Sequence, residues 1–90
     1  MNETIINEIK NTLMELKVLN LRIDEINPEQ EIIYYGIQSV HFIQLIVKLE
    51  TKYNIEFDDE VLHINKLSTV NKIAMYIEKK LDGENSIQIS

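Results

Sequence analysis

The sequence contains no cysteine and no tryptophan, only one proline and only two glycines. The lack of cysteine excludes a disulfide framework and any thiolate metal site. No apolar run approaches the length that a membrane-spanning helix needs, and the N-terminus has no apolar signal segment. The sequence therefore predicts a soluble, cytoplasmic protein.

Basic residues are also scarce. Nine lysines and arginines stand against fifteen aspartates and glutamates, which gives a formal net charge of -6. Such a surface repels nucleic acid and anionic lipid, and the sequence has no basic patch to offset the repulsion. We therefore expect no nucleic acid and no membrane among the partners, whereas basic protein surfaces are compatible with this charge.

The overall composition, with 44% hydrophobic and 27% charged residues, is that of a folded domain. Ninety residues accommodate one domain with one core. Asp82-Gly83 is typical of a helix end. We therefore expect residues 1–83 to form the domain and residues 84–90 to be a flexible C-terminal tail.

Apolar residues recur at helical spacing in residues 3–19, 39–53 and 68–81. A short helix is expected at Asp58–Leu62, because its acidic start suits the positive end of a helix. The sequence therefore predicts an all-α fold, a four-helix bundle with a short third helix.

Residues 20–38 lack helical periodicity, contain Pro28 and form the long first loop of this bundle. Long loops inside compact domains are uncommon and are often functional. We expect four isoleucines to anchor the loop in the core, namely Ile23, Ile26, Ile32 and Ile33.

The helix expected at residues 39–53 has two apolar faces. At 100° per residue, one face consists of Phe42, Leu45, Ile46, Leu49 and Tyr53, which suffices to pack a bundle core. Val40, Ile43 and Val47 form a second stripe on roughly the opposite side. Either the long loop covers this stripe or the stripe docks a partner.

Ser39 begins this helix, three residues after Gly36. Its hydroxyl is best interpreted, on chemistry alone, as an N-cap that accepts an unpaired backbone N–H. The surrounding "GIQSV" lacks the second glycine of a nucleophile elbow, and with only two histidines, His41 and His63, a catalytic triad has little to draw on. Two histidines without clustered carboxylates also make a poor metal site. A phosphate on Ser39 would instead lie in the positive field of the helix start, and Gly36 would allow a tight turn and close approach by a modifying enzyme.

The segment Gly36-Ile37-Gln38-Ser39-Val40 resembles the Gly-x-Asp-Ser-Leu motif of the acyl and peptidyl carrier protein family. The similarity continues through "FIQLIVKLETKYNIEF", "DDE" and "LSTVNKIAMYIEKKL", so it covers about Thr4 to Leu81. Members of this family are non-catalytic four-helix domains that carry a 4′-phosphopantetheine arm on the motif serine. The resemblance implies that this protein is not an enzyme, and that its arm comes from coenzyme A and is attached to Ser39.

The resemblance also implies partners. The first is a phosphopantetheinyl transferase. The second is an enzyme that loads an acyl, aminoacyl or peptidyl group onto the arm as a thioester, and downstream synthase or transferase enzymes follow. The carrier itself is expected to be a monomer. The residues expected to meet these partners lie around Ser39, along the second stripe and on the short third helix. They are Gly36, Gln38, Val40, Ile43, Gln44, Val47, Glu50, Asp59 and Glu60.

Three departures from the family pattern indicate a discrete carrier of a specialised pathway, such as polyketide or nonribosomal peptide synthesis. Gln38 replaces the usual aspartate, the helix at residues 39–53 is less acidic than in fatty-acid carriers, and the segment from His63 to Leu67 is slightly longer than usual. A D-alanyl carrier for cell-wall polymers would share the arm. The alternative from another class is a small helical adaptor that binds one protein and has no prosthetic group.

Overall fold

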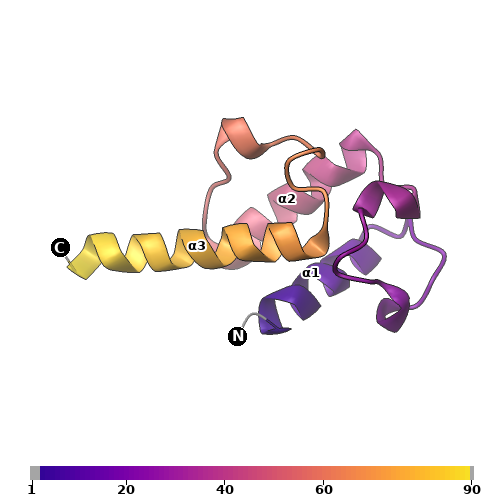
Figure 1. Cartoon of the computed structure of the whole chain (residues 1–90), viewed down its shortest axis with the longest axis horizontal. Coiled ribbons are helices and arrows are strands. Elements are labelled where there is room, and N and C mark those ends of the chain that lie inside the picture. Colours follow the sequence, from indigo (N-terminus) through magenta and orange to yellow (C-terminus); the bar gives the residue numbers. More distant parts are fainter. Residues whose placement is uncertain (1–2, 90) are drawn as a thin grey trace.

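The computed structural model describes residues 3–89, and within them the chain forms three α-helices joined by loops with short 3-10 turns. The helices are α1 (Glu3–Glu15), α2 (Ser39–Tyr53) and α3 (Val70–Ile89), and the turns are η1 (Ile23–Glu25), η2 (Ile32–Tyr35) and η3 (Asp59–Val61). Helix α1 packs against both α3 and α2 (Figure 1). The predicted all-α bundle is confirmed, and none of the described helices is both long and apolar enough to cross a bilayer.

The ends of the elements differ from the predictions. The short third helix is the three-residue turn η3, and α3 continues through Gly83 to Ile89, so the predicted helix end at Asp82-Gly83 is wrong. One glycine inside a helix costs only about 1 kcal/mol, which the other residues of a long helix can offset. The flexible tail at residues 84–90 stays a prediction, and Ser90 lies outside the described residues.

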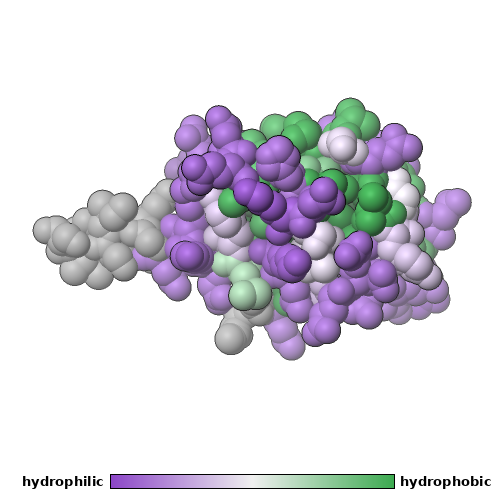
Figure 2. All heavy atoms as spheres, turned by 45° about the horizontal axis from the view of Figure 1, so that its top comes forward, coloured by the Kyte–Doolittle hydropathy of each residue, from purple (hydrophilic) through white to green (hydrophobic). Residues whose placement is uncertain are grey.

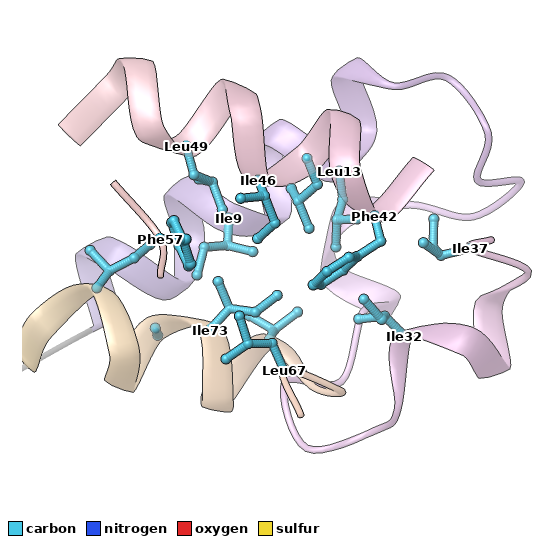
Figure 3. Packing of buried hydrophobic residues seen from close by; sticks show 14 of the residues in the cluster. Ile9, Leu13, Ile32, Ile37, Phe42, Ile46, Leu49, Phe57, Leu67 and Ile73 are labelled. Atoms are coloured by element: carbon cyan, nitrogen blue, oxygen red, sulfur yellow. The ribbon is translucent and has the colours of Figure 1, made fainter. Parts of the chain in front are cut away.

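The core combines apolar side chains from all three α-helices (Figure 3). The expected core face of α2 is confirmed, since its buried residues are Phe42, Leu45, Ile46 and Leu49. Tyr53, at the end of this face, is half-buried and packs against the same cluster.

Only two of the four expected loop anchors reach the core. Ile26 and Ile32 are buried, whereas Ile23 and Ile33 are exposed. Ile32 and Ile33 are neighbours in η2, and successive side chains of a 3-10 helix point about 120° apart, so both cannot face the core. The prediction for Ile23 and Ile33 is therefore wrong.

Glu50 holds the chain that leaves α2. Asn54 ends the helix in the left-handed conformation, and the chain then returns so that the Phe57 N–H donates to Glu50 Oε2 at 2.8 Å. The buried Phe57 ring stacks on Tyr76 of α3, with ring centroids 4.8 Å apart. Glu50 was expected to meet partners, but its carboxylate is engaged inside the fold.

We predict that Glu50→Ala lowers the free energy of unfolding by about 2 kcal/mol, because it leaves the half-buried Phe57 N–H without its charged acceptor. Glu56→Ala is the matched control, since Glu56 is exposed and removal of such a side chain changes stability by at most about 0.5 kcal/mol. Urea unfolding followed by circular dichroism measures both. Equal stabilities of the two variants would contradict this role for Glu50.

Candidate functional site

The turn before α2 depends on Gly36. It ends η2 with φ +87°, in the left-handed region, and its N–H donates to the Ile33 carbonyl at 3.0 Å. No atom lies within 4 Å of the position that a Cβ would take. Glycine is therefore required here for its backbone conformation and not for lack of space.

Two buried side chains then fix where α2 begins. Ile37 and Phe42 are each 1% exposed and lie in the same part of the core (Figure 3). Their positions, just before the N-cap and four residues after it, are those of a hydrophobic staple, which sets the angle at which a chain enters a helix. Burial of both leaves Ser39 and Val40, which lie between them, on the surface.

The N-cap of α2 is Gln38 and not Ser39, so the N-cap prediction is wrong. Gln38 has an extended backbone, its carbonyl accepts the Phe42 N–H at 2.8 Å, and its own N–H donates to His41 Nδ1 at 3.2 Å. Ser39 is already the first helical residue. Among the described residues, no group hydrogen-bonds its exposed hydroxyl, which leaves that hydroxyl available for chemistry.

The electrostatics at Ser39 suit a phosphate. The first N–H groups of a helix have no partner within it and carry the positive end of its dipole. The first turn of α2 contains no acidic residue that would oppose an anion. The described residues contain no group of three or more histidine, aspartate or glutamate side chains that could hold a metal ion. The residues present therefore fit a phosphodiester on Ser39 Oγ.

The second apolar stripe of α2 lies open on the surface. Val40, Ile43 and Val47 are 57%, 44% and 53% exposed. Figure 2 shows hydrophobic side chains gathered toward the end of the molecule where Figure 1 places the start of α2. The first loop thus does not cover the stripe, and we call these three residues the apolar stripe.

Acidic side chains of α1 pair with two lysines of α2, of which Lys48 lies beside the apolar stripe. Lys52 Nζ lies 3.3 Å from Glu8 and 3.2 Å from Glu15, and Lys48 Nζ lies 3.9 Å from Glu15. Burial alone would lower the pKa of Lys52, but its hydrogen bonds and charge interactions with Glu15 and Glu8 outweigh burial and raise that pKa. Burial chiefly raises the pKa of Tyr53, the next residue, and the charge of Glu8 adds to this effect.

The other residues expected to meet partners lie mostly on the surface. Gly36 and Gln38 adjoin Ser39, and Gln44 is exposed on the same helix as the apolar stripe. Asp59 and Glu60 are exposed on η3. Among the described residues of this set, only Glu50 forms a hydrogen bond through its side chain.

Sequence reasoning missed two residues that position Ser39, namely Ile37 and His41. The signals were present in the sequence. An apolar residue five positions before Phe42 indicates a staple, and a polar side chain three positions after Gln38 can reach back to its N–H.

Two comparisons with known proteins agree with this geometry. Residues 8–77 match the model of the phosphopantetheine attachment site family, so the chain belongs to this family of phosphopantetheine-carrying proteins. It is 33% identical over 75 residues to a protein described as acyl carrier protein from Wolinella succinogenes, and the match covers 82% of this chain and 93% of that protein. The resemblance inferred from the sequence is thereby confirmed.

Membership in the family has direct consequences. The protein is a non-catalytic carrier whose prosthetic group is 4′-phosphopantetheine. Carriers of this family receive that group from phosphopantetheinyl transferases. When bound, the group supplies a thiol on a long flexible arm, and this thiol holds the cargo as a thioester.

We predict that Val47→Asp impairs docking far more than folding, because Val47 points away from the core. Leu45→Asp is the matched control on the other face, where the side chain is 0% exposed and a charge costs several kcal/mol. Circular dichroism during urea unfolding measures stability, and the rate of arm transfer by a phosphopantetheinyl transferase measures docking. If Val47→Asp unfolds as readily as Leu45→Asp, the apolar stripe belongs to the core.

Proposed function

We propose that Ser39 is the attachment residue of the 4′-phosphopantetheine arm. The observation that supports this most strongly is the state of its hydroxyl. It is exposed on the first residue of α2, within the family match, and it makes no hydrogen bond with the described residues. In a transferase complex, Ser39 Oγ would lose its proton and attack the phosphate that carries the arm in coenzyme A. The pyrophosphate bond of coenzyme A then breaks, and adenosine 3′,5′-bisphosphate leaves.

The rest of the molecule supports the transport of cargo between enzymes. A tethered thioester meets each docked enzyme at a high effective concentration, which a freely diffusing substrate would not reach. The carrier, a monomer, docks through the apolar stripe, with Gly36, Gln38 and Gln44 beside it. Asp59 and Glu60, which are exposed on η3, are further residues that we propose to meet partners. Each contact is small and brief, so a loading enzyme and later synthase or transferase enzymes can share one carrier.

The pathway that we propose is a specialised one, of the polyketide or nonribosomal peptide kind. Fatty-acid carriers resembling this chain dock through an acidic helix. Here the exposed positions on α2 are apolar or neutral, and Lys48 and Lys52 are matched by the acids of α1. Recognition by apolar contact therefore favours dedicated partners over the enzymes of general fatty-acid synthesis.

We predict that incubation with coenzyme A and a broad-specificity phosphopantetheinyl transferase adds one arm to the wild-type chain and none to Ser39→Ala. Intact mass spectrometry measures the addition. Ser68→Ala is the matched control and keeps the modification, because the Ser68 hydroxyl is half-buried and accepts a hydrogen bond from Lys72 Nζ at 3.3 Å. Since Gln38 and not Ser39 is the N-cap, Ser39→Ala should cost less than the roughly 1 kcal/mol of a lost cap.

An arm on the alanine variant would show that another residue is the attachment site. No arm on either chain, with the transferase active on a control carrier, would favour the helical adaptor that uses the apolar stripe to bind one protein.

We also predict a weak effect of salt on docking. Long-range attraction between charges speeds association most where the docking faces are charged, and the overall charge of -6 supplies some steering here. A panel of loading enzymes first identifies the partner. The association rate with this partner should be near the unsteered value of about 10⁵–10⁶ M⁻¹s⁻¹. The rate should fall only slightly from low to physiological salt. Stopped-flow measurement at several ionic strengths tests this.

Lys48→Glu should improve use of the carrier by a fatty-acid synthase enzyme with a basic docking patch, because it makes the edge of the apolar stripe acidic. Lys79→Glu makes the same charge change on α3 and should have a smaller effect. A steep loss of association rate with salt for the wild-type chain would indicate that acids elsewhere, such as Asp59 and Glu60, make the docking surface.

A further inference from the structure

A small pocket lies where η2, the segment at residues 63–67 and the first turns of α3 meet. Its volume is about 130 Å³. An apolar cavity of similar size, about 150 Å³, holds a benzene-sized molecule, so this pocket suits a ligand of only a few heavy atoms. Its lining combines both charges with apolar surface and consists of Glu31, Ile33, Ile64, Asn65, Ser68 and Lys72.

Backbone hydrogen bonds hold the walls of this pocket in place. The Ile32 N–H donates to the Ser68 carbonyl at 2.7 Å, and Glu31 forms an isolated antiparallel bridge with Thr69. On the other wall, the Leu67 N–H donates to the His63 carbonyl at 3.0 Å and closes the segment at residues 63–67. This segment, through Ile64 and Asn65, therefore forms part of a preformed hollow.

The pocket lies within reach of an arm on Ser39. The carbonyl of Ile33, a lining residue, is 3.0 Å from the N atom of Gly36. Three further residues lead from Gly36 to Ser39 and span at most about 11 Å. The thirteen or so bonds between the phosphorus and the sulfur of the arm span roughly 16 Å when extended. The thiol end can therefore fold back to the pocket.

The polar groups of the pocket specify the ligand. Glu31 forms no ion pair among the described residues, and Lys72 Nζ donates only to the Ser68 hydroxyl, at 3.3 Å. One anionic acceptor thus lies in the same hollow as one cationic donor. An aminoacyl thioester presents the matching pair, an ammonium group and a carbonyl oxygen on adjacent carbons, whereas a simple acyl group has no cation for Glu31.

We infer that this pocket binds the cargo on the arm, and that the cargo is a small aminoacyl group. The ammonium group pairs with Glu31, the thioester carbonyl accepts from Lys72, and a short aliphatic side chain packs against Ile33 and Ile64. This inference rests on the proposed attachment at Ser39. It narrows the cargo to the aminoacyl class and assigns a binding role to a segment that the docking surface does not use.

The test compares three arms that differ at one position. A transferase loads the full chain from coenzyme A analogues that carry alanyl, lactyl or propionyl groups through a stable amide linkage. Backbone amide resonances of Ile33, Ile64, Asn65 and Ser68 report on the pocket. The alanyl arm should shift them relative to the propionyl arm, and the lactyl arm, which has a hydroxyl in place of the ammonium group, should shift them less.

Matched variants assign the effect to the pocket. Glu31→Gln should abolish the additional shift of the alanyl arm, whereas Glu29→Gln, an exposed change in the same loop, should preserve it. Lys72→Met should reduce the shifts of all three arms, because each carries the carbonyl that Lys72 contacts, and Lys79→Met should not. Each of these side chains is exposed, so the variants should fold like the wild-type chain.

The outcomes separate this inference from the proposed function. If intact mass shows no arm on Ser39, the proposed attachment fails and the inference fails with it. If the arm is attached but alanyl and propionyl arms give the same pocket resonances, the inference is overturned and Ser39 remains the attachment residue. Equal shifts in Glu31→Gln and the wild-type chain would likewise overturn it.

Discussion

The site depends on the burial of Ile37 and Phe42 on the two sides of the first turn of α2. With both side chains in the core, the chain between them must turn outward, and Ser39 is on the surface as the helix begins. Gly36 makes this path accessible through its positive φ, and His41 accepts the N–H of the N-cap residue. The fold thereby exposes the Ser39 hydroxyl, which makes no hydrogen bond with the described residues.

The pairing of α1 acids with α2 lysines determines the character of the neighbouring surface. Glu8 and Glu15 pair with Lys52, and Glu15 also lies near Lys48, so the lysines of α2 add little net charge to this side of the molecule. An apolar surface without a strong field gains little long-range attraction, so binding there depends on close contact. Such behaviour suits a carrier that must visit several enzymes in turn.

The long first loop links the core to both functional surfaces. Ile26 and Ile32 anchor it, while Glu31 and Ile33 turn outward and line the pocket. Adjacent residues can serve these opposite purposes because the loop contains 3-10 turns, in which neighbouring side chains point in different directions. A regular helix in this place would present longer stripes of one character.

The sequence by itself determined the two faces of α2, because the 3.6-residue period decides locally that Leu45 points inward and Val47 outward. It also placed Ser39 at the start of that helix. Only the tertiary structure decided that Gln38 is the N-cap, that Glu50 serves the backbone of Phe57 and that Ile33 faces outward. Each of these outcomes depends on which groups the folded chain brings within a few ångströms, and helical periodicity contains no information about contacts between distant segments.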